Sequence, residues 1–190
     1  NVTVLDRGIE PILKALEESG QADNTIVVFT SDHGDSLGDR GMLMKRSFYE
    51  EVARVPLIVH VPWLTDGEQR VEGSIGHTDL VPTLLDLMGQ TVPDHLQGAS
   101  RKDVLQGDAK LTDDVFMQWH GGAATISLGD AEFDRLSEVP WRSMVSGDRW
   151  KLNLSPGDTC ELYDLNNDPL ELTNLYDHPD HSGRVREMTV

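Results

Sequence analysis

The sequence contains a single cysteine and no long apolar run. Cys160 alone excludes an internal disulfide and a cysteine-based zinc site. The longest apolar stretches, "TIVVF" and "VPLIVHV", have the length of strands and fall short of the roughly 18 residues of a membrane-spanning helix. We therefore expect no membrane span. The chain begins with Asn1 rather than Met, so the lack of a recognisable signal peptide leaves its localisation open.

Positive charge is also scarce. The 190 residues include 5 Lys and 11 Arg against 21 Asp and 12 Glu, which gives a formal net charge of −17. Repulsion disfavours non-specific binding to nucleic acid or to an anionic membrane, so we expect neither as a partner. The excess of aspartate is typical of proteins from very salty cytoplasm and also of ordinary acidic surfaces, and the sequence leaves both readings open.

The first half of the chain alternates helical and strand patterns. Residues 5–19 space their apolar side chains as a helix does, and "NTIVVFTS" (24–31) reads as a strand buried on both faces. A second strand is expected at 56–62, and a helix at 77–89 with Thr78 or Asp79 as its N-cap. This order favours an α/β fold with a mainly parallel sheet, in which ligands bind beyond the carboxyl ends of the strands.

The second half is built from shorter pieces. A polar segment at 93–114 separates a first domain at 1–92 from a second at 115–190. Short strand-like stretches with turn residues between them predict a small antiparallel α+β subdomain there. The charged tail at 166–190 is expected to end in a short helix.

The stretch "SDHGDSLGDRG" directly after the first strand carries the most chemistry. Asp32 and His33 offer a carboxylate and an imidazole, which are both metal ligands. Adjacent residues of a strand point to opposite faces, so the backbone must leave the strand to aim both at one ion, and Gly34 gives that freedom. Lys45, beside a divalent ion, would serve an anionic ligand. The alternative interpretation is a charged loop without a ligand.

Four blocks in order resemble the C-terminal half of type I sulfatases of the alkaline phosphatase superfamily: "TIVVFTSDHGDSLGDRG", "MKRSFYEEVARVPLIV", "HTDLVPTLLDLMG" and "ELYDLNNDPLELTNL". The resemblance implies the C-terminal part of a mainly parallel sheet layered with helices. It also implies that Asp32 and His33 hold one divalent cation, with calcium as the first choice and manganese or magnesium open. Lys45 would contact the sulfate oxygens and act in catalysis, and His120 would line the substrate pocket.

The family's nucleophile is a formylglycine made from a C/S-x-P/A-x-R motif in the N-terminal half, and these 190 residues contain no such motif. Cys160 is followed by "ELY". We therefore expect a fragment, or one chain of a split enzyme, that is inactive alone and has the N-terminal half as its partner. The complete enzyme would hydrolyse a sulfate-ester small molecule, as choline sulfatases do, or a sulfated carbohydrate. The alternatives are a phosphonate or phosphate ester hydrolase of the same superfamily, and a non-catalytic binding or structural protein.

Overall fold

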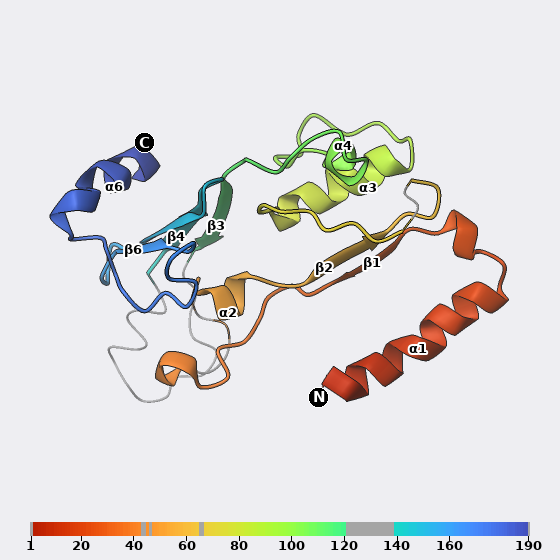
Figure 1. The fold of residues 1–190 in the computed structure, drawn as a ribbon, viewed down its shortest axis with the longest axis horizontal. Helices are drawn as coiled ribbons and strands as arrows, with labels where there is room; N and C mark the ends of the chain where they lie inside the picture. The colour runs from red at the N-terminus through yellow and green to blue at the C-terminus, as the bar shows by residue number, and fades with distance from the viewer. Residues whose placement is uncertain (1, 43–44, 46, 65–66, 121–138, 190) are drawn as a thin grey trace. The chain divides into compact units, whose positions relative to one another are not determined.

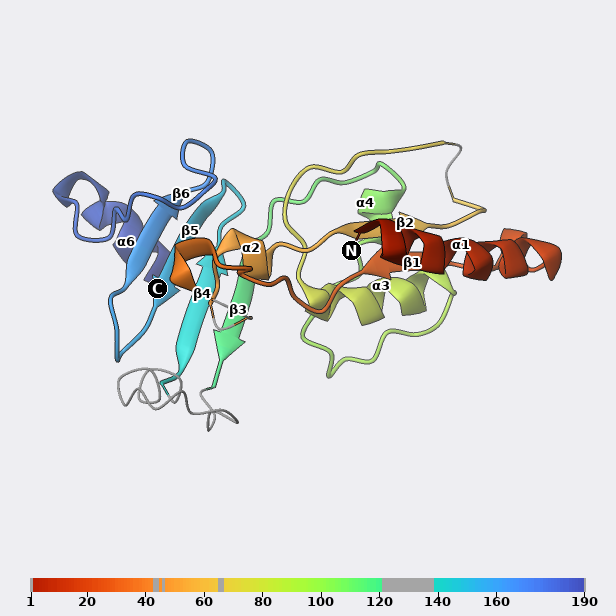
Figure 2. The same ribbon diagram turned by 90° about the horizontal axis from the view of Figure 1, so that it is seen from below.

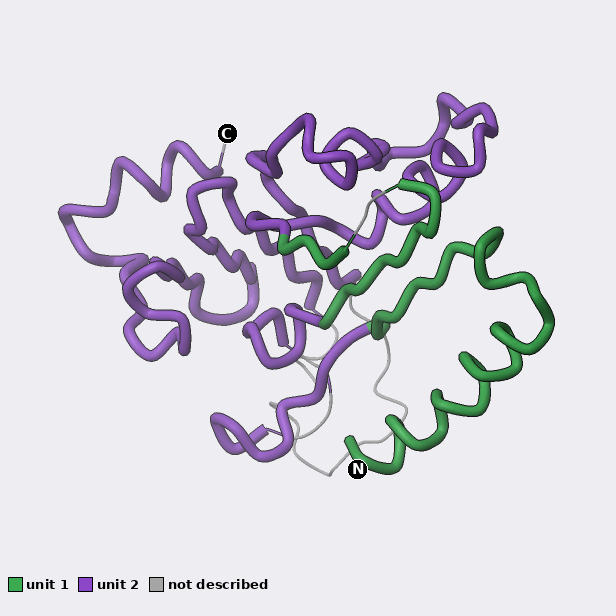
Figure 3. Tube along the Cα trace, turned by 45° about the vertical axis from the view of Figure 1, so that its right-hand side comes forward, with its two compact units in different colours: residues 1–32, 56–70 green, residues 33–55, 71–190 purple. Residues whose placement is uncertain are grey.

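The structure is a computed structural model that describes residues 2–189 except 43–44, 46, 65–66 and 121–138. The chain divides into two compact units, which Figure 3 distinguishes by colour. Unit 1 comprises residues 1–32 and 56–70, and unit 2 comprises residues 33–55 and 71–190. The domain boundaries that composition suggested, at 92 and 115, stay a prediction.

The elements follow one another as shown in Figure 1. The longer helices and the strands are α1 (Val2–Glu18), β1 (Val27–Thr30), β2 (Leu57–His60), α3 (Leu80–Leu87), β3 (Val115–Trp119), β4 (Trp141–Val145), β5 (Trp150–Leu154), β6 (Glu161–Asp164) and α6 (Ser182–Thr189). The short helices are η1 (Ala22–Asn24), η2 (Asp39–Gly41), α2 (Glu50–Ala53), η3 (His77–Asp79), α4 (Lys102–Leu105) and η4 (Pro179–His181). None of the helices in the described ranges combines the length and the apolar character that a membrane crossing requires.

Unit 1 consists of α1, η1 and the pair β1–β2. The helix predicted at 5–19 is confirmed as α1, and Gly20 follows it with a positive φ of 70°. No residue of α1 is buried, and the apolar side chains of Leu5 and Ile12 are 56% and 67% exposed. The described part of the chain therefore leaves the apolar face of this helix uncovered.

The strands β1 and β2 pair antiparallel, with Val27 opposite His60 and Thr30 opposite Leu57. Two expectations need correction here. The first strand is not buried on both faces, because its residues are half-buried or exposed. Every strand pairing in the described residues is antiparallel, so the mainly parallel sheet is not shown. The fold of the described chain is mixed α/β with antiparallel sheets.

Unit 2 contains the small antiparallel sheet that the sequence predicted, with the strand order β3-β4-β5-β6 (Figure 2). Met188 of α6 packs with Leu152 and Leu162 on one face. Because side chains of a strand alternate, Lys151 and Tyr163 point to the other face. That face carries a second apolar cluster of Val145, Tyr163 and Leu165, against which Tyr49 packs. The charged tail ends in a short helix, α6, as expected.

The helix predicted at 77–89 is confirmed as η3 followed by α3, but its capping differs from the prediction. Asp79 occupies the N-cap position and its side chain makes no capping hydrogen bond. Its Oδ2 instead pairs with Arg101 Nε at 2.9 Å, and its Oδ1 accepts from the backbone N–H of Ala99 at 2.9 Å. The carboxylate thus ties the helix start to the segment before α4.

Candidate active site

The loop at 33–51 turns sharply at its first glycine. The backbone N–H of Gly34 donates to the carbonyl of Val52 at 2.8 Å. A Cβ on Gly34 would lie 1.9 Å from the carbonyl oxygen of Glu51, a distance no side chain tolerates. Gly34 does not adopt a positive φ, so a glycine is required here by the close approach of the Glu51 carbonyl at α2, and not by the backbone freedom that the sequence suggested.

Two of the predicted site residues meet within this loop. The Nζ of Lys45 lies 2.7 Å from Nε2 of His33, and Nδ1 of His33 lies 2.7 Å from the carbonyl oxygen of Gly34. A carbonyl can only accept, so Nδ1 carries the proton and Nε2 presents a lone pair to the ammonium. These two contacts orient the ring of the half-buried His33, while the side chain of Lys45 is exposed.

The other two predicted site residues, Asp32 and His120, are both exposed to solvent. Asp32 is exposed, and its Oδ1 accepts from the hydroxyl of Ser31 at 3.4 Å. Asp32 closes unit 1, whereas His33 opens the first segment of unit 2. His120 is exposed and directly follows β3.

A basic residue, Arg40, anchors the part of the loop that precedes Lys45. Nη2 of Arg40 donates to the carbonyls of Leu170 and Glu171 at 2.6 and 2.8 Å. Its guanidinium carbon lies 3.8 Å from the ring centroid of Tyr49, within the range of a cation–π contact. Arg40 therefore joins the loop to a segment 130 residues further along the chain.

The end of the loop is anchored by a buried charged group. Lys151 on β5 is fully buried, and its Nζ lies 3.0 Å from Glu50 Oε1 and 2.9 Å from Glu171 Oε1. The other oxygen of Glu171 accepts from the backbone N–H of Glu50 at 2.7 Å. Burial raises the pKa of the Glu171 carboxyl above its ordinary value, against the opposing pull of Lys151 and of that hydrogen bond.

A tyrosine beside this group makes a further link. The hydroxyl of Tyr49 donates to Glu161 Oε1 at 2.5 Å, and the other oxygen of Glu161 accepts from Asn153 Nδ2 at 2.9 Å. Burial and the neighbouring carboxylate raise the pKa of Tyr49 far above its ordinary value, so the phenol stays protonated and remains a donor.

Sequence reasoning missed this set of anchors. Glu50 and Glu171 belong to charged stretches that look solvated, and the interpretation of 166–190 as a charged tail gave no reason to bury one of them. One signal was available. Lys151 lies between Trp150 and Leu152 in a strand, where a charge at an inward position needs a partner.

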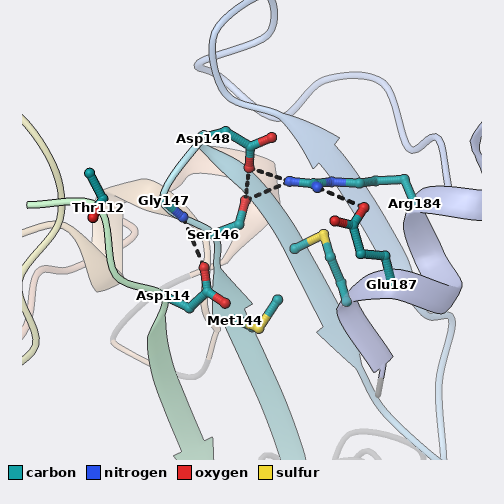
Figure 4. A pocket seen from close by; sticks show the side chains of 9 residues that line it. Thr112, Asp114, Met144, Ser146, Gly147, Asp148, Arg184 and Glu187 are labelled. Carbon is teal, nitrogen blue, oxygen red and sulfur yellow. Dashed lines mark hydrogen bonds and ion pairs between the residues drawn. The ribbon is translucent and has the colours of Figure 1, made fainter.

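A pocket of about 460 Å³ lies elsewhere in unit 2, and Figure 4 shows its lining. Arg184 points across it toward Asp148 and Ser146 and donates to Ser146 Oγ at 2.9 Å. The remaining lining residues are Thr112, Asp114, Met144, Gly147, Glu187 and Met188. None of the predicted site residues lines this pocket, so it adds nothing to the predicted site.

The donors of the loop suit a divalent cation only in part. The fixed tautomer of His33 leaves Nε2 as the nitrogen able to bind a metal, the arrangement common to metal-bound histidines. Within the described residues, however, no group of three or more His, Cys, Asp or Glu could hold a metal ion. Calcium takes six to eight oxygen ligands. Asp32 and His33 could therefore supply only a minority of a complete shell.

Residues 38–189 match the family model described as N-sulphoglucosamine sulphohydrolase, C-terminal. The chain belongs to this sulfatase family. The match confirms the resemblance to the C-terminal half of type I sulfatases. It covers the anchoring residues and Lys45, whereas Asp32 and His33 precede it.

Curated relatives of this sulfatase chain agree with the family. It is 32% identical over 189 residues to N-acetylglucosamine-6-O-sulfatase of Bacteroides thetaiotaomicron, a match that covers 98% of this chain and 33% of the relative. It is 33% identical over 193 residues to choline-sulfatase of Rhizobium meliloti, with 100% of this chain and 34% of that protein covered. The chain spans about a third of the length of these curated relatives.

Solved structures extend the likeness to the fold. One is of a protein in complex with its substrate D-glucosamine-2-N,6-O-disulfate. It superposes with a TM-score of 0.85 at 30% identity, over 99% of this chain and 37% of the other. Phosphonate monoester hydrolase from Silicibacter pomeroyi superposes with a TM-score of 0.79 at 28% identity, over 97% and 37% of the two chains. This chain thus shares its fold with a protein whose substrate is a glucosamine disulfate and with a phosphonate monoester hydrolase.

Proposed function

We propose that this chain is the C-terminal portion of an enzyme that hydrolyses a sulfate ester to an alcohol and inorganic sulfate. The observation that carries the proposal is the placement of the Lys45 ammonium 2.7 Å from Nε2 of His33, on the loop that follows Asp32, in a chain of the sulfatase family. The N-terminal part of the complete enzyme supplies the formylglycine nucleophile and the parallel strands of the sheet.

In this proposal Lys45 binds the sulfate group. Negative charge gathers on the sulfate oxygens and on the leaving oxygen in the transition state, so a fixed ammonium stabilises it more than the ground state. The hydrogen bond from Nδ1 to Gly34 keeps the His33 ring oriented. Since Lys45 is exposed, its side chain can leave His33 for an anion without breaking a core contact.

Asp32 and His33 are proposed as two ligands of one divalent cation, which when bound would stabilise charge on the sulfate oxygens. The Nε2 lone pair can serve the Lys45 ammonium or a metal ion, and only one at a time. A cation on Nε2 therefore requires Lys45 to release it, which favours the ammonium contacting the anion. Calcium is the first choice, with manganese or magnesium as alternatives, since an imidazole nitrogen suits a transition ion better.

The substrate is proposed to be a sulfated carbohydrate or a small sulfate ester. Two similar proteins act, by name, on N-acetylglucosamine-6-O-sulfate groups and on choline sulfate. A solved relative holds a glucosamine disulfate as substrate. His120, exposed after β3, is proposed to contact the alcohol portion of the ester.

The second candidate activity is hydrolysis of a phosphonate or phosphate monoester. The fold similarity to a phosphonate monoester hydrolase, with a TM-score of 0.79, specifically favours it. A tetrahedral anion with a phosphorus centre would use the same ammonium and the same cation.

The test compares p-nitrophenyl sulfate, p-nitrophenyl phosphate and a p-nitrophenyl phosphonate with the complete enzyme and with this chain alone. The sulfatase proposal expects the highest kcat/KM of the complete enzyme on the sulfate, and no turnover by the chain alone. Preference for the phosphonate would establish the second candidate. If the complete enzyme turns over none of these three esters, and neither sulfated glucosamine nor choline sulfate, the result would support a non-catalytic protein.

A further inference from the structure

We propose that Lys151, Glu50 and Glu171 are positioning residues that hold the Lys45 loop in its working orientation. We call these three residues the anchor cluster. The inference rests on the proposed function, and it assigns to the C-terminal sheet a role in the chemistry of a loop more than 100 residues away in sequence.

The first argument is where the anchor cluster attaches. Glu50 begins α2 and lies five residues after Lys45, so it fixes the point where the loop ends. It is held twice, by Lys151 at 3.0 Å through its side chain and by Glu171 at 2.7 Å through its backbone N–H. Both partners come from the C-terminal part of unit 2, and Arg40, five residues before Lys45, donates to the carbonyl of the same Glu171 at 2.8 Å.

The second argument concerns charge. Lys151 and Glu171 have fully buried side chains, whereas Glu50 is 19% exposed. Two carboxylates share one ammonium, and burial raises the pKa of Glu171. Buried ion pairs of this kind are weak sources of stability, since apolar residues of the same shape often do as well or better. The ion pairs of the anchor cluster instead fix positions, because each of them holds one backbone segment against another.

The third argument is backbone strain. Glu171 has a φ of 53°, in the left-handed region that side chains rarely adopt. In this conformation its carbonyl accepts from Arg40 while its carboxylate reaches both Lys151 and the N–H of Glu50. Glu171 thereby holds the chain both five residues before and five residues after Lys45.

The experiment is a double-mutant cycle in the complete enzyme. Glu171→Gln and Lys151→Met are each made with Lys45 intact and with Lys45→Ala, and kcat/KM is measured for all combinations. With Lys45 intact we expect a loss of about 10- to 100-fold, mainly in kcat, because a misplaced group costs rate of that order. With Lys45→Ala the same changes should cost less than about threefold, since there is no ammonium left to misplace.

The matched control is Lys102→Met, which removes a different lysine–carboxylate contact of unit 2, between Lys102 Nζ and Asp86 Oδ1 at 3.0 Å. It is expected to leave kcat/KM within about twofold of the parent, because this pair is only partly buried and, in the part of the chain that the structure describes, contacts neither the Lys45 loop nor the anchor cluster. Glu50→Gln provides a milder variant if the buried changes prevent folding, because it removes one negative charge while the pair of Lys151 and Glu171 remains.

Hydrogen exchange at the amides of residues 47–52 gives a readout that does not depend on activity. Faster exchange in Glu171→Gln, and unchanged exchange in Lys102→Met, is expected. Equal activity losses with and without Lys45 would overturn the proposal and leave the anchor cluster a stability element. Unchanged exchange and activity in the folded variants would also overturn it. If Lys45→Ala alone leaves sulfate-ester hydrolysis intact, the proposed role of Lys45 fails, and the exchange data still decide whether the loop is held by the anchor cluster.

Discussion

A neutral imidazole has one lone pair, and in this structure that of His33 faces an ammonium. The proton on Nδ1 is held by the Gly34 carbonyl at 2.7 Å, so the ring cannot present its other nitrogen without breaking that bond. The sequence indicated Asp32, His33 and Lys45 as one group because of their residue types and spacing. It could not indicate that Lys45 and His33 contact each other directly, because the intervening residues turn through positive-φ positions at Leu37 and Arg40.

Replacing Lys45 with alanine is expected to lower kcat/KM of the complete enzyme by about 10²- to 10³-fold, the effect of removing one donor to a developing anion. Steady-state kinetics on the preferred ester measure it. Lys14→Ala is the matched control, since Lys14 is a 70% exposed lysine on α1. An unchanged kcat/KM in Lys45→Ala, with the control also unchanged, would contradict the role of Lys45.

Replacing His33 with asparagine is expected to shift metal preference toward calcium over manganese. An amide oxygen replaces an imidazole nitrogen, and calcium binds oxygen ligands while transition ions favour nitrogen. Titration calorimetry of the complete enzyme with each ion gives the two dissociation constants. His95→Asn, a change at an exposed loop histidine, is the control. A ratio of constants that stays the same in His33→Asn would exclude His33 from the metal shell.

At the scale of elements, the sequence predicted the helices and strands that depend on nearby residues. It did not predict the contacts that depend on residues far away in the chain. Apolar spacing gave α1, α3 and the small C-terminal sheet. The prediction that β1 is buried on both faces was wrong. A run of β-branched residues indicates that a strand is suited to burial, but it does not show which other elements cover the strand. Asp79 was predicted as a cap from its position, yet Arg101, 22 residues away, takes its carboxylate at 2.9 Å.

Gly34→Ala is expected to destabilise the junction between β1 and the loop. The added Cβ would meet the Glu51 carbonyl at 1.9 Å, so the backbone must move and the hydrogen bond from Gly34 to Val52 must lengthen or break. Overpacking of this kind costs about 1–3 kcal/mol. Denaturant unfolding of the variant measures the loss of unfolding free energy.

Gly8→Ala is the control for that change. Gly8 lies in α1 with no atom within 4 Å of an added Cβ, so the substitution should be neutral or stabilise the helix by up to about 1 kcal/mol. A Gly34→Ala protein as stable as the parent would show that the loop can move away from α2.

For the molecule as a whole, acidity is the dominant surface property. With 33 acidic and 16 basic residues, the charge of −17 favours unfolding through self-repulsion near neutral pH. Three aspartates counter this destabilisation, because hydrogen bonds in the folded state stabilise their ionised form. Hydrogen bonds from Ser100 and Lys102 lower the pKa of Asp86, and Ser146 with Arg184 lowers that of Asp148. Hydrogen bonds from Asn166 and Asn167 do the same for Asp164.

The thermal midpoint is expected to hold or rise slightly as pH falls from 7 to about 5, and then to fall below about pH 4. A carboxyl whose folded pKa is lowered contributes stability above its unfolded pKa, about 3.9 for aspartate, and loses it as pH falls through the folded value. Glu171 acts in the opposite sense, because its raised pKa disfavours the ionised form.

Calorimetry between pH 2.5 and 7 measures this dependence. Asp148→Asn should flatten the acid limb, while Asp23→Asn, a change in the exposed η1 turn, should not. A midpoint that keeps rising down to pH 2.5 would show that repulsion, and not these hydrogen-bonded aspartates, governs acid stability.

The bonds that hold the Lys45 loop join residues separated by 101 to 131 positions in the chain. During synthesis on a ribosome, Arg40 and Glu50 emerge long before Lys151 and Glu171 do. A nascent chain that has passed the loop still lacks every one of these partners until β5 and the segment after β6 have left the exit tunnel. The proposed site residues Asp32, His33 and Lys45 would therefore reach their working arrangement only after residues 151 and 171 have been made, so a stop between residues 50 and 151 would yield a polypeptide that contains these three residues without the side chains that hold their loop.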